Sequence, residues 1–377
     1  MIVTIKRAEF LDAAKRAASI APSETPMDVL KGVLMEADTT NGKLIITSTN
    51  MEIALEEKIS CTVQEEGAFV FSAKMLTEML QRLPSDTVQI SRLDNRGRMA
   101  LRGECACYEM DVWDRGAFPK PDLPFPEDTV KLSGIPDMAQ RTVFATAQDN
   151  SKPLLKCVNL KFTDVGLRAA GSDGSCIVTA KGDEQSRGDI SLLVPAASLG
   201  KLARMCTNKD AFCVGTTGKN IVFFKEDFLF SARLMEGGYI DTDLLLRTVK
   251  NSFTVLTDIQ DMRNALSSVL TVDPDGRVML GFRDHRLEFR CHGEYGTASA
   301  PVEVIALTGA PSGDFWFASR QLSTCLKALS GTVTLGIASG GMLTLSTQDA
   351  YYMQSAMRAP TEKKKEETAR TSAAKAA

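Results

Sequence analysis

The feature that most constrains this chain is a segment that occurs three times at a fixed spacing. Each copy is a strand end that runs into a helix start, and the copies lie 123 residues apart: Phe71–Leu76, Val194–Leu199 and Phe317–Leu322. The helix after each copy carries apolar residues at i, i+3, i+4 and i+7, which is the spacing of one buried helix face. These residues are Leu76, Met79, Leu80 and Leu83; Leu199, Leu202, Ala203 and Cys206; and Leu322, Cys325, Leu326 and Leu329. Three copies in one register indicate a chain built from internal repeats.

Alternating strand patterns mark the same repeat. Leu44–Ser48, Leu167–Gly171 and Leu287–Cys291 lie 123 and then 120 residues apart. Each follows another strand pattern, at Val33–Glu36, Val158–Lys161 and Val278–Gly281. Period-two alternation predicts antiparallel sheets with one dry face and one wet face.

The repeats predict three tandem domains, at residues 1–124, 125–248 and 249–360. A run of prolines between Pro119 and Pro126 marks the first boundary, because it interrupts helix and sheet alike. Each domain has two helix patterns: Phe10–Ile20 and Lys74–Leu83, Pro136–Thr146 and Ala196–Cys206, Ile259–Leu270 and Arg320–Leu329. We therefore expect an α+β fold of three repeats, each with two helices packed inside two antiparallel sheets.

Composition limits the class of protein and its location. The nine cysteines form no CxxC pair and the two histidines leave little room for a zinc site, so we expect a reduced cytoplasmic protein without metal or cofactor. No apolar run reaches the ~18 residues of a membrane span. Residues 361–377 lack large apolar side chains, which predicts a disordered Lys/Glu/Ala tail.

The outward face of the repeated helix is basic in a chain whose formal net charge is −3. At 100° per residue, the positions opposite the apolar stripe are Lys74, Glu78, Gln81, Ala197, Lys201, Arg204, Arg320, Thr324 and Lys327. Lys15 and Arg16 add to this charge from the first helix. The face is either an ordinary solvated surface or a layer that faces a polyanion.

Few and diffuse positive charges suit a protein that must stay on DNA and still move along it. A tight DNA binder makes many phosphate contacts, and its affinity falls steeply with salt. A closed ring of repeats retains DNA by topology instead, with the helices lining the hole and the sheets outside.

The sequence resembles the bacterial sliding clamp family, the beta subunit of DNA polymerase III, over residues 1–360. Besides the repeats, the matching segments are Lys31–Ala37, Thr49–Ile53, Phe118–Pro119, Ser172–Gly174 and Phe230–Gly237. The resemblance implies a head-to-tail homodimer that forms a six-domain ring around duplex DNA, independent of sequence. It also implies that the ring tethers the DNA polymerase III alpha subunit, the clamp loader and other replication and repair proteins, as a processivity factor without catalytic residues.

The resemblance also implies two sets of site residues. The predicted DNA-channel residues are Lys15, Arg16, Lys74, Gln148, Lys152, Lys201, Arg204, Arg320 and Lys327. The predicted partner-peptide cleft, between the second and third domains, consists of Leu155, Ser172, Gly174, Ile177, Ile240, Leu244, Leu245, Ser355, Met357 and Arg358. The alternative is that the apolar members form interdomain core.

This chain departs from the family pattern at the cleft. Where the family has Thr-Asp-Gly-His-Arg-Leu, residues 172–177 read Ser-Asp-Gly-Ser-Cys-Ile, and the usual Met-Pro-Met-Arg-Leu ending reads Ser-Ala-Met-Arg-Ala at 355–359. These departures indicate a divergent clamp with an altered preference for client motifs, or a tail that competes for the cleft.

Enzymatic alternatives find little support. No GxxxxGK[ST] motif is present, which argues against a P-loop ATPase. Cys291 and His292 are neighbours on a strand pattern and would point to opposite faces. Asp258, Asp261, Asp273 and Asp275 fit helix-capping and turn chemistry. A metal-dependent nuclease or hydrolase on a repeated α+β scaffold is the remaining alternative.

Overall fold

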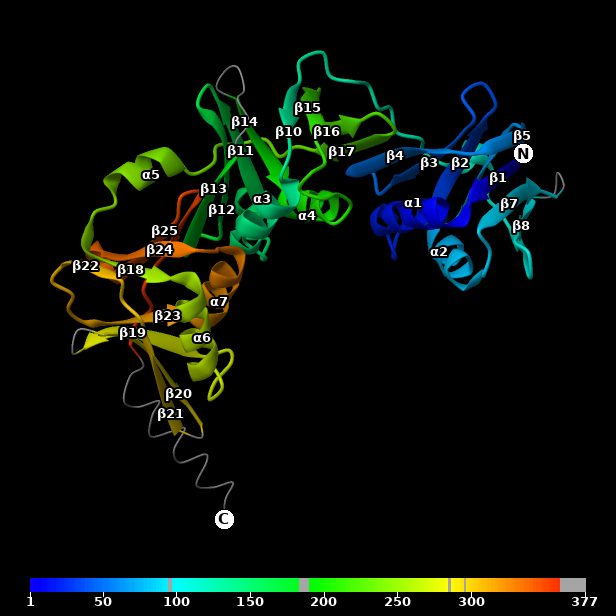
Figure 1. Ribbon diagram of the computed structural model, residues 1–377. Helices are drawn as coiled ribbons and strands as arrows, with labels where there is room; N and C mark the ends of the chain where they lie inside the picture. The colour runs from blue at the N-terminus through cyan, green and yellow to red at the C-terminus, as the bar shows by residue number, and fades with distance from the viewer. Residues whose placement is uncertain (94–96, 183–189, 284–285, 295, 360–377) are drawn as a thin grey trace. The chain divides into compact units, whose positions relative to one another are not determined.

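The computed structural model describes residues 1–93, 97–182, 190–283, 286–294 and 296–359. Its elements follow one order six times: a strand, a helix and three strands. Outside this order lie β5, β22 and the short helix α5. Each predicted repeat thus contains this five-element unit twice, with the two helices expected from the sequence (Figure 1).

The elements of each repeat have the following bounds. The first repeat contains β1 (Ile2–Lys6), α1 (Arg7–Ile20), β2 (Gly32–Asp38), β3 (Lys43–Thr49), β4 (Ile53–Ser60), β5 (Thr62–Glu65), β6 (Gly67–Ser72), α2 (Ala73–Arg82), β7 (Thr87–Arg92), β8 (Arg98–Arg102) and β9 (Cys107–Asp111). The second contains β10 (Val130–Leu132), α3 (Ile135–Thr142), β11 (Cys157–Thr163), β12 (Gly166–Ser172), β13 (Cys176–Gly182), β14 (Ile190–Pro195), α4 (Ala196–Ala203), β15 (Phe212–Thr217), β16 (Asn220–Lys225) and β17 (Phe228–Arg233). After α5 (Thr242–Thr248), the third contains β18 (Asn251–Asp258), α6 (Ile259–Val269), β19 (Arg277–Arg283), β20 (Arg286–Gly293), β21 (Gly296–Val302), β22 (Ala306–Gly309), β23 (Asp314–Ala318), α7 (Ser319–Ala328), β24 (Thr332–Ala338), β25 (Met342–Ser346) and β26 (Ala350–Gln354).

All six predicted helices are present, and the two in the second repeat are shorter than expected. After α3, residues 143–145 form a 3₁₀ turn instead of continuing the helix. The β-branched pair Thr142 and Val143 disfavours further α-helix there, and the Thr142 hydroxyl donates to the Met138 carbonyl at 2.7 Å. Helix α4 ends at Ala203, and the next two residues make i+3 bonds. A short last turn of this kind is common at helix ends.

The strands form four antiparallel sheets among the described residues. Sheet A has the order β5-β1-β7-β8-β9, and sheet B has the order β10-β15-β16-β17-β4-β3-β2-β6. Sheet C has the order β14-β11-β12-β13-β26-β25-β24-β18-β22, and sheet D has the order β21-β20-β19-β23. Sheets B and C each take strands from two repeats.

The chain divides into two compact units, each with its own core. The first comprises Met1–Ile135 and Lys201–Leu234, and the second comprises Pro136–Gly200 and the chain from Met235 onward. In the first unit α1 and α2 lie side by side (Figure 1) and bury Phe10, Ile20 and Leu76. In the second unit α6 and α7 pack together and bury Met262 and Leu322.

The domain boundaries predicted near residues 124 and 248 stay a prediction. The compact units do not follow them, because sheet B joins strands of the first and second repeats in one unit. The tail predicted at 361–377 lies outside the described residues. No helix in the described ranges is long and apolar enough to cross a membrane.

Candidate functional site

A tight turn between β12 and β13 forms the centre of the predicted peptide cleft. The Ser172 hydroxyl donates to the Cys176 carbonyl at 2.8 Å and accepts from the Gly174 amide at 3.1 Å. Asp173 Oδ1 accepts from the backbone amides of Ser175 and Cys176 at 2.7 and 2.8 Å. Gly174 has φ +91°, a conformation that L side chains rarely adopt. The Asp and Gly of this turn are therefore required by its backbone.

Three further predicted residues lie against this turn. A Cβ on Gly174 would lie 2.9 Å from Lys152 Nζ and 3.8 Å from Leu155 Cδ1. The Ser355 amide donates to the Ser175 carbonyl at 2.9 Å, which ties the end of the chain to the turn. Lys152, predicted for DNA contact, thus lies beside a residue predicted for the peptide cleft.

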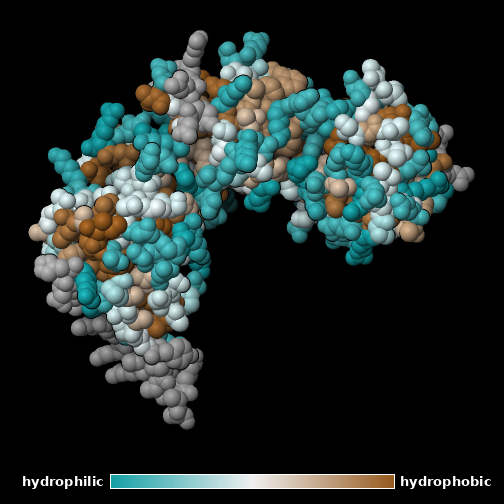
Figure 2. All heavy atoms as spheres, in the orientation of Figure 1, coloured by the Kyte–Doolittle hydropathy of each residue, from teal (hydrophilic) through white to brown (hydrophobic). Residues whose placement is uncertain are grey.

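The segment from Tyr239 to α5 carries the next group of predicted cleft residues. The Tyr239 phenol donates to the Cys157 carbonyl at 3.4 Å, and burial raises the pKa of this phenol. Ile240 follows as a half-buried residue. On α5, Leu244 is 60% exposed and Leu245 is half-buried. Figure 2 shows apolar surface beside α5 in the second unit.

The last predicted cleft residues lie on the segment that follows β26. The Met357 amide donates to the Trp316 carbonyl at 2.7 Å, and Arg277 donates to the Arg358 carbonyl at 2.8 Å. These bonds attach the segment to sheet D, while the Met357 side chain stays 37% exposed. Ile177 is only 8% exposed, so it contributes more to the core than to an open surface.

The structure adds Gln321 to this neighbourhood, a residue that the sequence analysis did not select. Its side-chain Nε2 donates to Asp173 Oδ2 at 2.5 Å and to the Ser175 hydroxyl at 3.2 Å. Its side-chain Oε1 accepts from Gln354 Nε2 at 3.2 Å. Gln321 therefore links α7 to the 172–176 turn. The only sequence signal was a polar residue one position before the buried Leu322.

In the first unit, three predicted DNA-channel residues are exposed and a fourth is half-buried. Lys15, Lys74 and Arg204 are exposed, and Lys201 is half-buried on α4. Partial burial lowers the pKa of Lys201, and the neighbouring charge of Arg204 lowers it further. Adjacent cations of this kind attract an anion more strongly than either does alone.

Arg16 differs from these four because its guanidinium is held by a protein partner. It donates to the two carboxylate oxygens of Glu57 at 2.9 and 2.5 Å. The Glu57 side chain is 10% exposed and that of Arg16 is 29% exposed. The hydrogen bond to Glu57 raises the pKa of Arg16. A bidentate pair of this geometry fixes the Arg16 side chain to strand β4.

In the second unit, Gln148, Lys152, Arg320 and Lys327 are exposed. Arg320 donates to the Asp275 carboxylate at 2.8 Å, and both side chains of this pair are largely in solvent. Such a surface pair is weak and leaves Arg320 able to exchange partners. Gln148 donates to the Thr146 carbonyl at 3.3 Å.

Catalytic chemistry finds no support in the described ranges. They contain no group of three or more His, Cys, Asp or Glu side chains that could hold a metal ion. Burial raises the pKa of the Cys176, Cys291 and Cys325 thiols, which keeps them protonated and unreactive. Cys105 and Cys107 are exposed.

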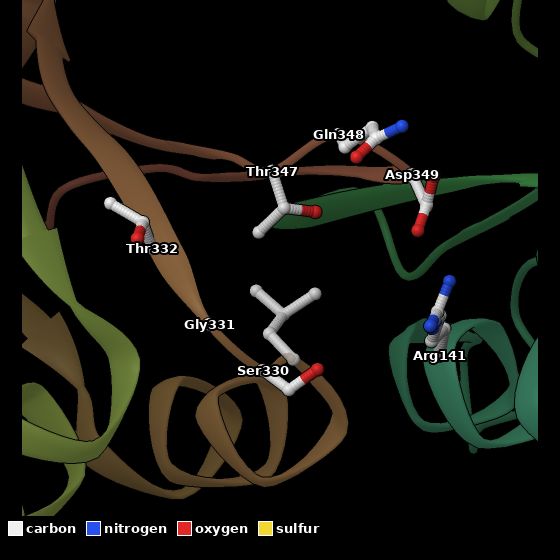
Figure 3. Close-up of a pocket in the computed structure, with 8 residues that line it drawn as sticks. Arg141, Ser330, Gly331, Thr332, Thr347, Gln348 and Asp349 are labelled. Atoms are coloured by element: carbon white, nitrogen blue, oxygen red, sulfur yellow. The ribbon is translucent and has the colours of Figure 1, made fainter.

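Two pockets in the second unit lie near these surfaces. A polar pocket of about 330 Å³ is lined by Arg141, Leu329, Ser330, Gly331, Thr332, Thr347, Gln348 and Asp349. Figure 3 shows Arg141 and Asp349 pointing toward each other across it. The other pocket, about 400 Å³, lies between α6 and α7 and includes Arg263 and Lys327.

Comparison with known proteins identifies the family. The model of the N-terminal domain of the DNA polymerase III beta subunit matches residues 1–120, and that of the central domain matches residues 129–241. The chain belongs to the DNA polymerase III beta subunit family. The beta sliding clamp of Synechococcus elongatus is 26% identical over 82% of this chain and 85% of its own length. The clamp of Bacillus subtilis is 23% identical over 65% of this chain and 68% of its own length.

Solved clamp structures share the fold. The Bacillus subtilis sliding clamp has a TM-score of 0.86 at 19% identity and covers 96% of this chain, with all of its own chain aligned. A Pseudomonas aeruginosa clamp bound to griselimycin has a TM-score of 0.86 at 20% identity and covers 95% of this chain, again over its whole length. These matches confirm the predicted clamp fold. Family membership also confirms a processivity clamp in place of an enzyme, and gives the nuclease alternative no support.

Proposed function

We propose that two copies of this beta subunit family member associate head to tail into a closed ring that encircles duplex DNA. The ring carries the DNA polymerase III alpha subunit and other replication proteins along the duplex. The proposal rests above all on the strand order of the sheets. In the described chain, strand β9 lies at an edge of sheet A and strand β21 lies at an edge of sheet D.

Sheets B and C each combine four strands of one repeat with four strands of the next, and sheet C has β22 in addition. In sheet B, β17-β16-β15-β10 meets β4-β3-β2-β6 through the pair β17 and β4. In sheet C, β26-β25-β24-β18 meets β13-β12-β11-β14 through the pair β26 and β13. Both junctions therefore join the last strand of one repeat to the end of the first half of the preceding repeat.

Sheets A and D each have the strand order of one of these two four-strand sets. Sheet A contains β9-β8-β7-β1, which corresponds to β17-β16-β15-β10, and sheet D is β21-β20-β19-β23, which corresponds to β4-β3-β2-β6. Edge strands with free backbone groups are templates for pairing with another chain. Pairing of β9 in one copy with β21 in the next would form, between the two copies, a continuous sheet like sheets B and C. Two such sheets would close the ring.

The charges on the helices support passage of DNA through such a ring. Lys74, Lys201, Arg320 and Lys327 lie on three equivalent helices, Arg204 lies in the turn directly after α4, and all five reach solvent. A chain of net charge −3 with these scattered cations would make few phosphate contacts. Retention then depends on closure of the ring, and sliding meets little resistance.

The cleft residues supply a site for partner proteins. We assign client peptides to the surface around the 172–176 turn, where Leu155, Leu244 and Met357 offer exposed or half-exposed apolar side chains. The Pseudomonas aeruginosa clamp binds griselimycin. We expect griselimycin to bind this chain and to shift the methyl NMR signals of these three residues. We infer a cytoplasmic location from the family.

A linearisation experiment tests the proposal. The protein is assembled on nicked circular DNA by its clamp loader, and the circle is then cut once. A topologically linked ring leaves the cut DNA within minutes and stays on uncut circles during gel filtration. Protein that remains on the linear product at physiological salt would contradict encirclement. A chain that behaves as a monomer in sedimentation would contradict the dimeric ring.

A further inference from the structure

Helix α5 belongs to none of the three repeats. It lies in the connection between β17 and β18 and contains only the seven residues Thr242–Thr248. A helix this short is marginal in water by itself, because nucleation is costly and few hydrogen bonds follow it. Its position must therefore come from contacts with the rest of the second unit.

One carboxylate supplies two of these contacts. Asp243 accepts from Lys161 Nζ at 2.9 Å and also forms an ion pair with the Arg168 guanidinium. The side chain of Asp243 is 26% exposed, and those of Lys161 and Arg168 are 31% and 34% exposed. Partial burial makes such a pair stronger than one in open solvent.

The position of the two cations gives this carboxylate a structural role. Lys161 in β11 and Arg168 in β12 are directly opposite each other in the antiparallel ladder of sheet C. Like charges in this relation destabilise a strand pair. Asp243 offsets the repulsion and holds α5 against the same face of the sheet.

The helix presents its apolar side chains from this anchored position. Leu244 is the residue after Asp243 and is 60% exposed, and Leu245 and Leu246 are half-buried. Upstream, Gly237 adopts φ +147° against Leu154, and Gly238 follows. Two successive glycines give the connection little stiffness of its own. The Tyr239 bond to the Cys157 carbonyl and the buried Thr242 hold the start of the segment, and the ion pairs of Asp243 fix the helix that carries Leu244 and Leu245.

We propose that Asp243, Lys161 and Arg168 form a clasp that positions α5 for peptide binding, with Asp243 as the positioning residue. The inference rests on the proposed function, in the part that assigns Leu244 and Leu245 to the partner cleft. The clasp has no contact with the peptide itself. It acts by holding the two leucines in the bound geometry before the peptide arrives, which reduces the cost of ordering them.

Asp243→Asn tests the clasp with griselimycin and the full-length polymerase alpha subunit of the same organism as probes. We expect the Kd for both probes to rise about threefold to tenfold, the range of a partly buried ion pair that couples to binding. The matched control is Asp241→Asn, which removes the same charge two residues away. Asn caps a helix as well as Asp does, so the bond to the Leu244 amide at 3.0 Å is kept.

A double-mutant cycle separates the clasp from a local effect on the helix. In a Lys161→Met/Arg168→Met background, binding is expected to be weakened already, and Asp243→Asn should add less than a twofold change. An equal loss from Asp243→Asn in both backgrounds would overturn the clasp, as would an unchanged Kd in the wild-type background. If the wild-type chain binds neither probe, the proposed cleft itself fails and the clasp with it. Circular dichroism melting of every variant shows that the fold is intact.

Discussion

The ion pair of Arg16 and Glu57 shows how one residue can follow a sequence pattern and still have an additional role. Arg16 lies on the outward side of the first helix pattern, beside the exposed Lys15. Its partner Glu57 is 41 positions away on β4, so no local pattern could reveal the pair. A carboxylate with a 10% exposed side chain needs such a partner, because burial of an unpaired charge is costly.

We expect Glu57→Gln to lower the free energy of unfolding by about 2 kcal/mol, since the Arg16 guanidinium then lacks a charged partner in a half-buried position. Urea titration followed by circular dichroism measures the change. The control is Glu56→Gln on the same strand, whose contact with Lys58 is 3.8 Å long and more exposed. It should change stability by less than about 0.5 kcal/mol. Equal effects of the two variants would contradict the structural role of the Arg16–Glu57 pair.

Asp210 makes a second residue-level prediction, which concerns pH. Hydrogen bonds from Lys225 and from Thr207 lower the pKa of this carboxyl from 3.8 to about 2. A carboxyl whose pKa is depressed by folding contributes stability above its unfolded pKa and loses it as the pH falls toward the folded value. Asp210→Asn should therefore cost about 1 kcal/mol at pH 7, after allowance for solvent screening. In urea titrations the difference from wild type should shrink between pH 4 and pH 2. A difference that persists unchanged across this range would rule out the ion pair as its source.

At the scale of elements, apolar spacing predicted the helices that bury a face. Leu322, Cys325, Leu326 and Leu329 are all buried, and so are Leu76, Met79, Leu80 and Leu83. Their spacing could be read from the sequence because burial of one helix face imposes a 3.6-residue period. The bounds of α3 and α4 were less predictable, since the last turn of a helix depends on local hydrogen bonds more than on apolar spacing.

Helix α5 and the turn beside it mark the limit of sequence reasoning. Three successive leucines have no helical period, and the ion pairs of Asp243 join residues about 80 positions apart. Resemblance to the clamp family nevertheless selected Leu244 and Leu245, because it aligns positions without reference to their contacts. It did not select Gln321, whose bonds to Asp173 and Ser175 depend on how α7 meets the 172–176 turn.

Helix α4 and the turn that follows it carry a prediction about DNA. Reversal of two charges by Lys201→Glu/Arg204→Glu places carboxylates where the proposed channel meets phosphate, so loading onto nicked circular DNA should fall at least about tenfold. Dimerisation should be unchanged, because neither residue lies on β9 or β21. The control is Lys131→Glu/Lys219→Glu, which reverses two exposed lysines in and beside strands of sheet B, and it should load normally if both variants fold as wild type. Loss of the dimer in the α4 variant would instead place this helix at a subunit interface.

At the scale of the whole molecule, the repeats fix how two copies would pair. The repeated strand pattern begins at Leu44, Leu167 and Leu287, and these leucines oppose Ile59, Gly182 and Val302 in the next strand. Four residues before each opposing position lie Leu55, Val178 and Ala298, so these three residues are equivalent. Leu55 opposes Phe230 and Val178 opposes Tyr352 in the two internal junctions.

The position equivalent to Phe230 and Tyr352 in the first repeat is Tyr108. All three are aromatic, and they oppose Phe223, Leu345 and Leu101 in the neighbouring strands. The same register across subunits places Tyr108 opposite Ala298, and therefore Cys107 opposite Ser299.

Ser299→Cys in a Cys105→Ser background gives the sharpest test of the ring. Opposed residues in an antiparallel pair have Cα atoms about 4.5–5.5 Å apart, which lies within the range that a disulfide with Cys107 can span. Mild oxidation should yield a covalent dimer on a non-reducing gel.

If the ring is loaded on nicked circular DNA before oxidation, two disulfides close it covalently. The cross-linked ring should then stay on the circle in SDS and leave after the circle is cut. Ala298→Cys, which points to the other face of the strand, should cross-link poorly. Efficient cross-linking of Ala298→Cys alone would contradict the register, and release of the cross-linked Ser299→Cys dimer from uncut circles by SDS would contradict encirclement.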